Sequence, residues 1–177
     1  VEALFAQLKE EGYEYVIAVP LSAGISSTAS MIEAAAKRAE LPISVIDPYT
    51  TVNTQWYLAV CARELAEQGV EPQEIERRLK ASVESGNTLL VPDDLMHLKR
   101  GGRLTPLAAT LGSMLKIKPI LQLNVGTGGK VDVLDKVRTM SKALARMVEV
   151  AREDGFVPGE YELRLLDSEG GDSVEQL

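Results

Sequence analysis

Residues 15–28 read YVIAVPLSAGISST, an apolar run that passes directly into a turn of small and hydroxyl-bearing residues. The run through Leu21 is typical of a strand that is buried on both faces of a parallel sheet. Apolar positions then recur at helical spacing and are expected to face inward: Met31, Ile32, Ala35 and Ala39. A strand, a turn and a helix in this order predict an α/β fold.

The same alternation continues up to residue 70. A second short strand is expected at 43–46, and a helix after it. The buried stripe of that helix is predicted to be Trp56, Tyr57, Val60, Cys61 and Leu65. Residues 1–70 are therefore expected to be part of an N-terminal α/β lobe whose parallel sheet is covered by helices.

Residues 71–177 are expected to form part of a second α/β lobe with a mixed sheet and helices. The pattern begins with a helix that buries Ile75, Leu79 and Val83. Two strands, 118–123 and 130–137, are predicted to pair as a hairpin around the glycine-rich turn 126–129. A long amphipathic helix follows, and residues 161–166 are predicted to be a last strand.

Composition excludes several classes of protein. The chain has 177 residues, of which 45% are hydrophobic and 25% are charged, as in an ordinary globular protein. Its single Cys and single His argue against a disulfide framework and against a thiolate or histidine metal site. No apolar run is long enough to span a bilayer and no signal peptide pattern opens the chain, so we expect a cytoplasmic protein without stable membrane insertion.

The charge is unevenly distributed along the chain. The formal net charge is -7, yet residues 99–152 contain eleven Lys and Arg against three acidic residues. This basic block indicates an anionic ligand or an acidic partner, although basic side chains also cover ordinary exposed faces. The block contains no Phe or Trp to stack on bases, so nucleic acid binding is not expected.

The turn at 22–28 is the first candidate site. It places backbone N–H groups and hydroxyls where a buried strand ends and a helix begins, a position suited to an anion. Ser22 is a candidate donor from the strand end, and Ser26 or Ser27 is a candidate to cap the helix or to donate to a carboxylate. The alternative is that the serines only cap the helix. The spacing matches neither the dinucleotide fingerprint nor the phosphate loop.

Two arginines are the second candidate site. Arg103 follows Gly101-Gly102, and its guanidinium suits a carboxylate or a phosphate. Arg138 stands where a helix begins, which is unfavourable for a cation without an anion nearby. His97 has no acidic or nucleophilic partner at a recognisable spacing. From the residues alone, a small-molecule or phosphate-binding α/β enzyme that uses the serine-containing turn and Arg103 remains an alternative function.

Several segments resemble the DegV family. Residues 21–28 are similar to its serine-rich turn, and residues 94–104 are similar to its Leu-x-x-Leu-x-x-Gly-Gly-Arg signature. Residues 111–121 and 136–138 match in the same order. The resemblance covers the middle of the family's chain. Two positions depart from the family pattern, which usually has a second Ser in place of Ala23 and a Gly in place of Ser27.

The resemblance implies a bacterial, two-lobed α/β protein that holds one long-chain fatty acid in an interior tunnel. By position, the carboxylate would lie at the turn formed by Ser22, Ala23, Gly24 and Ser26. Arg103 and Arg138 would lie on the face that meets the acyl phosphate or a separate fatty-acid kinase. The chain itself would be a lipid-binding subunit, with no catalytic residue, no metal and no cofactor other than the fatty acid.

Overall fold

The computed structural model describes residues 1–110, 117–166 and 168, and the chain divides into two compact units. The first unit consists of Val1–Thr88 and Leu123–Lys130, and the second of Leu89–Gln122 and Val131–Leu177. Residues 71–88 thus lie in the first unit. The division into an N-terminal lobe at 1–70 and a second lobe at 71–177 stays a prediction.

The first unit is built around a small parallel sheet, as the sequence predicts. Strands β1 (Val16–Ala18) and β2 (Ile43–Val45) pair in parallel, with Val16 opposite Ile43. Four helices accompany them: α1 (Glu2–Glu10), α2 (Thr28–Ala39), α3 (Val52–Glu67) and α4 (Pro72–Glu84). Each strand has three residues and is shorter than the apolar run that predicts it.

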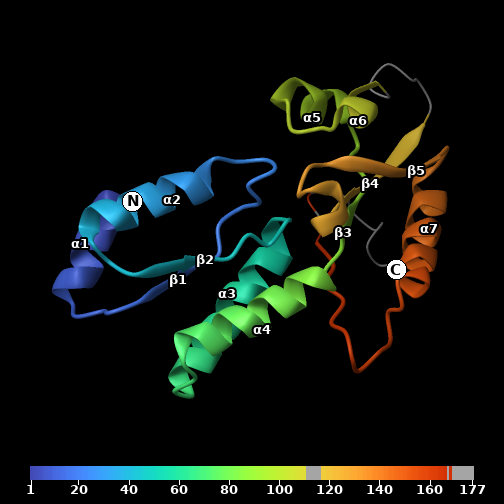
Figure 1. Ribbon diagram of the computed structural model, residues 1–177. Coiled ribbons are helices and arrows are strands. Elements are labelled where there is room, and N and C mark those ends of the chain that lie inside the picture. The colour runs from blue at the N-terminus through green and yellow to red at the C-terminus, as the bar shows by residue number, and fades with distance from the viewer. Residues whose placement is uncertain (111–116, 167, 169–177) are drawn as a thin grey trace. The chain divides into compact units, whose positions relative to one another are not determined.

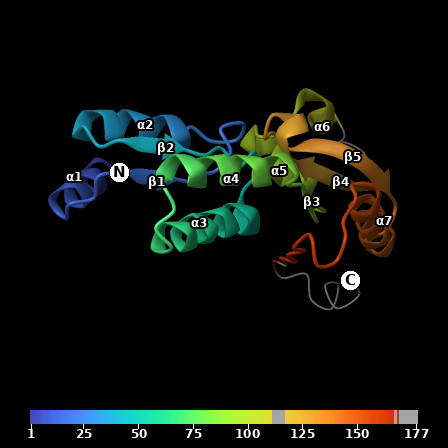
Figure 2. The ribbon, with the colours of Figure 1, turned by 60° about the horizontal axis from the view of Figure 1, so that its bottom comes forward.

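Helices cover both faces of this sheet. Val16 and Ile43 pack with Phe5 of α1 and with Ala35 and Ala36 of α2. On the other face, Ile17 and Val19 pack against a cluster of residues from α3 and α4 together with the residue that follows β2: Ile46, Leu58, Ala62, Ile75, Leu79 and Val83. Successive strand residues point to opposite faces, so neighbouring residues of β1 join different clusters. Figure 1 shows the strands between the α1–α2 pair and the α3–α4 pair, and in Figure 2 α2 and α3 lie on opposite sides of the strands.

The apolar pattern predicts the buried face of α4 correctly and that of α3 only in part. All three predicted core residues of α4 are buried, at 1–6% exposure. On α3 the buried residues are Leu58 and Ala62, whereas Trp56 is 55% exposed. Met31 of α2, also predicted to face inward, is 58% exposed. Both helices carry apolar residues on more than one side, and the packing partner decides which side is buried.

The second unit contains the remaining sheet. Its strands lie in the order β3 (Thr88–Leu90), β4 (Lys118–Leu123) and β5 (Asp132–Val137), of which only the end residues Thr88 and Leu123 belong to the first unit, and β4 and β5 are antiparallel. The predicted hairpin is therefore confirmed. Its helices are α5 (Leu95–Gly101), α6 (Pro106–Thr110) and α7 (Met140–Glu153). The sequence also predicts a short apolar helix at 107–115, of which α6 contains the first residues, and residues 111–115 lie outside the described part of the chain.

The predicted last strand is wrong. Tyr161 forms only an isolated bridge with Pro158, and the residues after it take no regular structure as far as Leu166. Leu163 and Leu165 are 61% and 47% exposed. Alternating apolar residues make a strand only where another strand offers hydrogen bonds and a face to bury them.

Candidate functional site

The serine turn, residues 22–28, connects β1 to α2 and is tied to the loop that follows β2. The backbone N–H of Ser22 donates to the carbonyl of Thr50 at 2.9 Å. The N–H of Ala23 donates to Asp47 Oδ2 at 3.1 Å. These bonds fix the turn at the carboxyl ends of the two parallel strands, where ligands of open α/β sheets commonly bind.

A third segment of the first unit, residues 124–130, lies against the serine turn. Asn124 caps the short 3₁₀ helix η2 (Val125–Thr127), and Gly128 and Gly129 follow with positive φ angles of 62° and 67°. A Cβ on Gly24 would lie 2.5 Å from the Gly128 carbonyl oxygen, and one on Gly129 would lie 1.9 Å from Ser22 Oγ. The two backbones therefore touch, and only glycine fits at Gly24 and Gly129.

The hydroxyl of Ser22 holds this contact together. Ser22 is fully buried, its Oγ donates to the Gly129 carbonyl at 3.0 Å, and it accepts from the Gly24 N–H at 3.1 Å. A serine hydroxyl has one proton to donate. In this structure that proton is already used, so Ser22 supports the shape of the turn.

Ser26 and Thr28 form a hydroxyl pair at the start of α2. Their oxygens are 2.7 Å apart, and Ser26 Oγ also accepts from the Thr28 N–H at 3.2 Å. The pair has two hydroxyl protons and uses one of them internally, which leaves one to donate. The N-terminal end of a helix also favours negative charge. Among the residues predicted to contact the carboxylate, Ser26 thus belongs to a pair of hydroxyls that can still donate one hydrogen bond.

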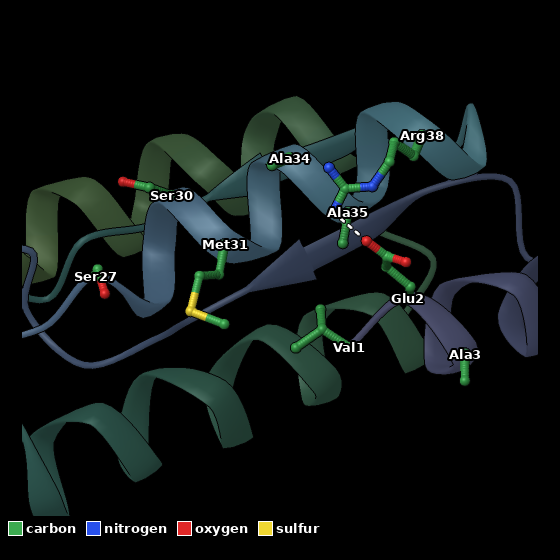
Figure 3. Close-up of a pocket in the computed structure, with 9 residues that line it drawn as sticks. All are labelled: Val1, Glu2, Ala3, Ser27, Ser30, Met31, Ala34, Ala35 and Arg38. Carbon is green, nitrogen blue, oxygen red and sulfur yellow. Dashed lines mark ion pairs between the residues drawn. The ribbon is translucent and has the colours of Figure 1, made fainter.

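A groove of about 700 Å³ runs along α2, and Ser27 is the residue of the serine turn that lines it. It is lined by Val1, Glu2, Ala3, Ser27, Ser30, Met31, Ala34, Ala35 and Arg38. Figure 3 shows Ser27 and Ser30 at one end, the Met31 side chain pointing into the middle, and an ion pair between Arg38 and Glu2 at the other end. The groove is thus polar at its ends and apolar between them, and it is open to solvent.

Sequence reasoning missed two residues of this site. Asp47 is evident in the sequence only as the end of a strand, yet its carboxylate binds the Ala23 N–H and the Tyr49 N–H. Gly129 is evident only as part of a hairpin turn, yet it accepts from Ser22, 107 positions away in the chain. The positive φ of 51° at Tyr49 marks the same junction. Contacts over such separations have no local sequence signal.

The two predicted arginines lie at opposite ends of one strand. Arg103 is exposed and donates to the Gly101 carbonyl, and its own carbonyl accepts from the Val131 N–H just before β5. Arg138 is exposed and follows the last residue of β5. A six-residue strand separates them by about 20 Å. One phosphate cannot contact both side chains, whereas an extended protein surface can.

Among the described residues, the carboxyl groups with a shifted pKa form ion pairs that include no residue of the serine turn. Hydrogen bonds from Lys80 and Ser44 lower the pKa of Glu76, and those from the Lys136 N–H and the Arg146 side chain lower the pKa of Asp135. His97 is exposed on α5. Within residues 1–110, 117–166 and 168, no three His, Cys, Asp or Glu side chains gather as a metal site would require. No helix in this described part is long and apolar enough to cross a membrane.

Comparison with known proteins places these features in a family. The family model described as "Uncharacterised protein, DegV family" matches residues 1–177. The DegV domain-containing protein YqaC of Lactococcus lactis is 30% identical over the whole chain, which spans 63% of that relative. The matched region is therefore less than two thirds of the relative's length.

Two solved structures have the same fold. The fatty acid binding DegV family protein of Streptococcus agalactiae is 34% identical, with a TM-score of 0.79 over 86% of this chain and 54% of that one. DegV of Bacillus subtilis, described as a fatty acid binding protein, is 33% identical, with a TM-score of 0.72 over 87% of this chain and 55% of that one. This likeness confirms the predicted α/β architecture.

Proposed function

Because the chain belongs to the DegV family, we propose that it binds a long-chain fatty acid. The observation that carries the proposal is its likeness to the fatty acid binding protein of Streptococcus agalactiae, at 34% identity and a TM-score of 0.79. The groove supports it, because hydroxyl groups at one end of an apolar channel suit a ligand with a polar head and an alkyl chain.

In the proposed complex the alkyl chain lies along α2 and the carboxylate lies at the start of that helix. Each buried CH₂ group contributes about 0.8 kcal/mol, so contacts with Met31, Ala34 and Ala35 supply most of the affinity. The Ser26–Thr28 pair donates its remaining proton to the carboxylate. Ser22, Ala23 and Gly24 shape the turn around the head group. The enclosed tunnel implied by the family stays a prediction.

We further propose that the chain is a cytoplasmic lipid-carrying subunit and that a separate kinase phosphorylates the bound fatty acid. Arg103 and Arg138 are exposed at the two ends of β5, about 20 Å apart. This separation supports a role in docking, because a protein partner is large enough to contact both side chains at once. In this proposal Arg103 and Arg138 contact the kinase, and the chain contributes no catalytic residue of its own.

Titration of the delipidated chain with oleate tests the binding site. Ser26→Ala is expected to weaken oleate binding about tenfold, because a hydrogen bond to a charged group is worth about 1.5–3 kcal/mol. Ser82→Ala is the matched control, because it removes a serine hydroxyl from the exposed side of α4 and should leave the affinity unchanged. An unchanged affinity in Ser26→Ala would contradict the placement of the head group. Absence of saturable oleate binding by the wild-type chain would contradict the function.

A further inference from the structure

The groove along α2 ends at an ion pair that joins two helices. Arg38 lies in the last turn of α2 and Glu2 in the first turn of α1, and both side chains line the groove. Figure 3 shows the Arg38 guanidinium turned toward the Glu2 carboxylate, with Met31 between this pair and Ser27. The apolar part of the groove is therefore bounded by hydroxyl groups at the start of α2 and by two charges near its end.

The length of α2 between these two ends can be compared with the length of an alkyl chain. Ser27 and Arg38 are eleven positions apart, and a helix rises about 1.5 Å per residue, which gives about 16 Å. Carbon–carbon bonds of about 1.5 Å in an extended zigzag advance about 1.3 Å per bond. An extended chain of about 14 carbons therefore reaches from the start of α2 to the ion pair.

Carbons beyond this length meet charged groups that are in contact with water. The side chains of Arg38 and Glu2 are 60% and 65% exposed, so water solvates both charges. An alkyl chain that covers them removes this water, and the cost of desolvating charged groups opposes the gain from burying CH₂ groups. A chain that avoids the pair leaves the groove and stays in water. In both cases the further carbons add little to the affinity.

We propose that the Glu2–Arg38 ion pair sets the length of alkyl chain that the groove can bury, at about 14 carbons. The proposal rests on the proposed function, because it concerns the alkyl chain of the fatty acid in that same groove. Each carbon up to this length adds buried apolar surface and tightens binding. Longer fatty acids bind as well, with their last carbons outside the groove. Glu2 and Arg38 are thus specificity-determining residues for chain length.

A second ion pair between the same two helices separates this role from a purely structural one. Lys9 Nζ of α1 lies 3.6 Å from the carboxylate of Glu40, the residue that follows α2, and neither side chain lines the groove. If the Glu2–Arg38 pair only holds α1 against α2, its loss should act like the loss of the Lys9–Glu40 pair. Such a loss would lower the affinity for fatty acids of every length alike. A change in the dependence on chain length therefore reports the position of Glu2 and Arg38 at the end of the groove.

The experiment measures dissociation constants of the delipidated chain for dodecanoate, tetradecanoate, hexadecanoate and octadecanoate, by competition with one fluorescent fatty acid. Two double variants remove both charges: Glu2→Leu with Arg38→Leu makes the end of the groove apolar, and Glu2→Gln with Arg38→Met keeps side chains of similar length. The matched control is Lys9→Met, which removes the other ion pair between α1 and α2. Thermal unfolding of each variant identifies any that has lost the fold.

The expected result is a limit near tetradecanoate that depends on the Glu2–Arg38 pair. In the wild-type chain and in Lys9→Met, binding should tighten about fifteenfold from dodecanoate to tetradecanoate, because each CH₂ group contributes about 0.8 kcal/mol. From tetradecanoate to octadecanoate it should tighten by less than about threefold. In both double variants hexadecanoate should bind about fivefold more tightly than tetradecanoate, because the chain can then continue past the end of the groove.

Three results would contradict the inference. A steady gain through octadecanoate in the wild-type chain, or an unchanged limit in the folded double variants, would overturn the role of the ion pair while leaving the proposed function intact. If Lys9→Met moves the limit as far, the contact between α1 and α2 sets the chain length and not the end of the groove. If the wild-type chain binds none of the four fatty acids, the proposed function fails, and this inference fails with it.

Discussion

Gly129 lies where the backbone of one segment touches the side chain of another. A methyl group at this position would lie 1.9 Å from Ser22 Oγ, and the φ angle is +67°. Gly129→Ala is therefore expected to lower the free energy of unfolding by about 3 kcal/mol, through both overpacking and backbone strain. Urea denaturation followed by circular dichroism measures the change.

Gly128 provides the control for that prediction. Its φ angle is similar, +62°, but a Cβ there would meet no atom within 4 Å. Gly128→Ala is expected to cost only the backbone strain, about 1 kcal/mol. Equal losses of stability in the two variants would mean that the close contact with Ser22 does not form in solution.

At the level of single residues, the sequence predicts where the chain turns between strand and helix better than it predicts the hydrogen bonds that each side chain forms. It predicts an anion-binding turn at 22–28, which stays a proposal, and the structure shows that Ser22, Gly24 and Ser26 take part in the hydrogen bonds of this turn. The sequence cannot show that the Ser22 hydroxyl donates its hydrogen bond to the Gly129 carbonyl, because the two residues are 107 positions apart. Hydrogen-bond partners of this kind are set by tertiary packing, which a local pattern does not encode.

The packing of α3 gives a prediction at the scale of a helix. Leu58 is 1% exposed within the cluster shared by α3, α4 and the sheet, so Leu58→Ala should lower the free energy of unfolding by about 3 kcal/mol. Leu4→Ala is the control on α1, because Leu4 is 54% exposed and its loss should cost less than about 0.5 kcal/mol. Similar losses in both variants would contradict the packing described for α3.

A polar network connects β2 to α4 and makes a prediction about pH. Ser44 is buried; its hydroxyl bonds to Tyr15 Oη at 2.7 Å and donates to Glu76 on α4. Hydrogen bonds from Lys80 and Ser44 lower the pKa of Glu76 below its ordinary value of 4.5. A carboxyl group with a lowered pKa in the folded state stabilises the fold above its unfolded pKa, and this stability is lost as the pH falls through the folded pKa.

Glu76→Gln is therefore expected to cost about 1 kcal/mol at pH 7. The difference from the wild-type chain should shrink as the pH falls below about 4.5, where the carboxyl group of the unfolded chain gains its proton. Urea denaturation at pH 7, 5 and 3.5 measures the difference. A difference that stays constant over this range would contradict the network.

Elements with one apolar face are predictable from the sequence, and those with several are not. The α4 helix buries all three predicted residues because its other sides are charged, as the Arg77 and Arg78 ion pairs with Glu74 show. The β4–β5 hairpin follows from its apolar runs and glycine-rich turn. By contrast, Trp56 of α3 is exposed although it lies in an apolar stretch.

At the scale of the whole molecule, the hairpin connects the two units through the chain itself. Its strands belong to the second unit, whereas its tip, Leu123–Lys130, belongs to the first and supplies the Gly129 contact to the serine turn. A domain boundary predicted from the order of helices and strands cannot show this, because it assigns each continuous stretch of sequence to one unit, whereas Leu123–Lys130 belongs to the first unit and the residues on either side of it to the second. The resemblance to a family suggests the ligand class that we propose, which no pattern of residues alone indicates.

The proposed docking role of the arginines is tested on the whole chain with its fatty acid bound. Arg103→Ala and Arg138→Ala are each expected to reduce phosphorylation by a fatty-acid kinase roughly tenfold, because loss of an interfacial cation slows association and weakens the complex. Oleate binding should not change, since both side chains are exposed and neither lines the groove. Loss of oleate binding in both variants would contradict this division of roles.

The central claim is that the chain binds a fatty acid, and its most direct test is to identify what the protein carries. Mass spectrometry of lipid extracted from the chain, freshly purified from bacterial cells, measures the bound molecules and their amount. The account predicts long-chain fatty acid at a ratio near one per chain. Extracts that contain no long-chain lipid, from folded protein that also fails to take up added oleate, would contradict it.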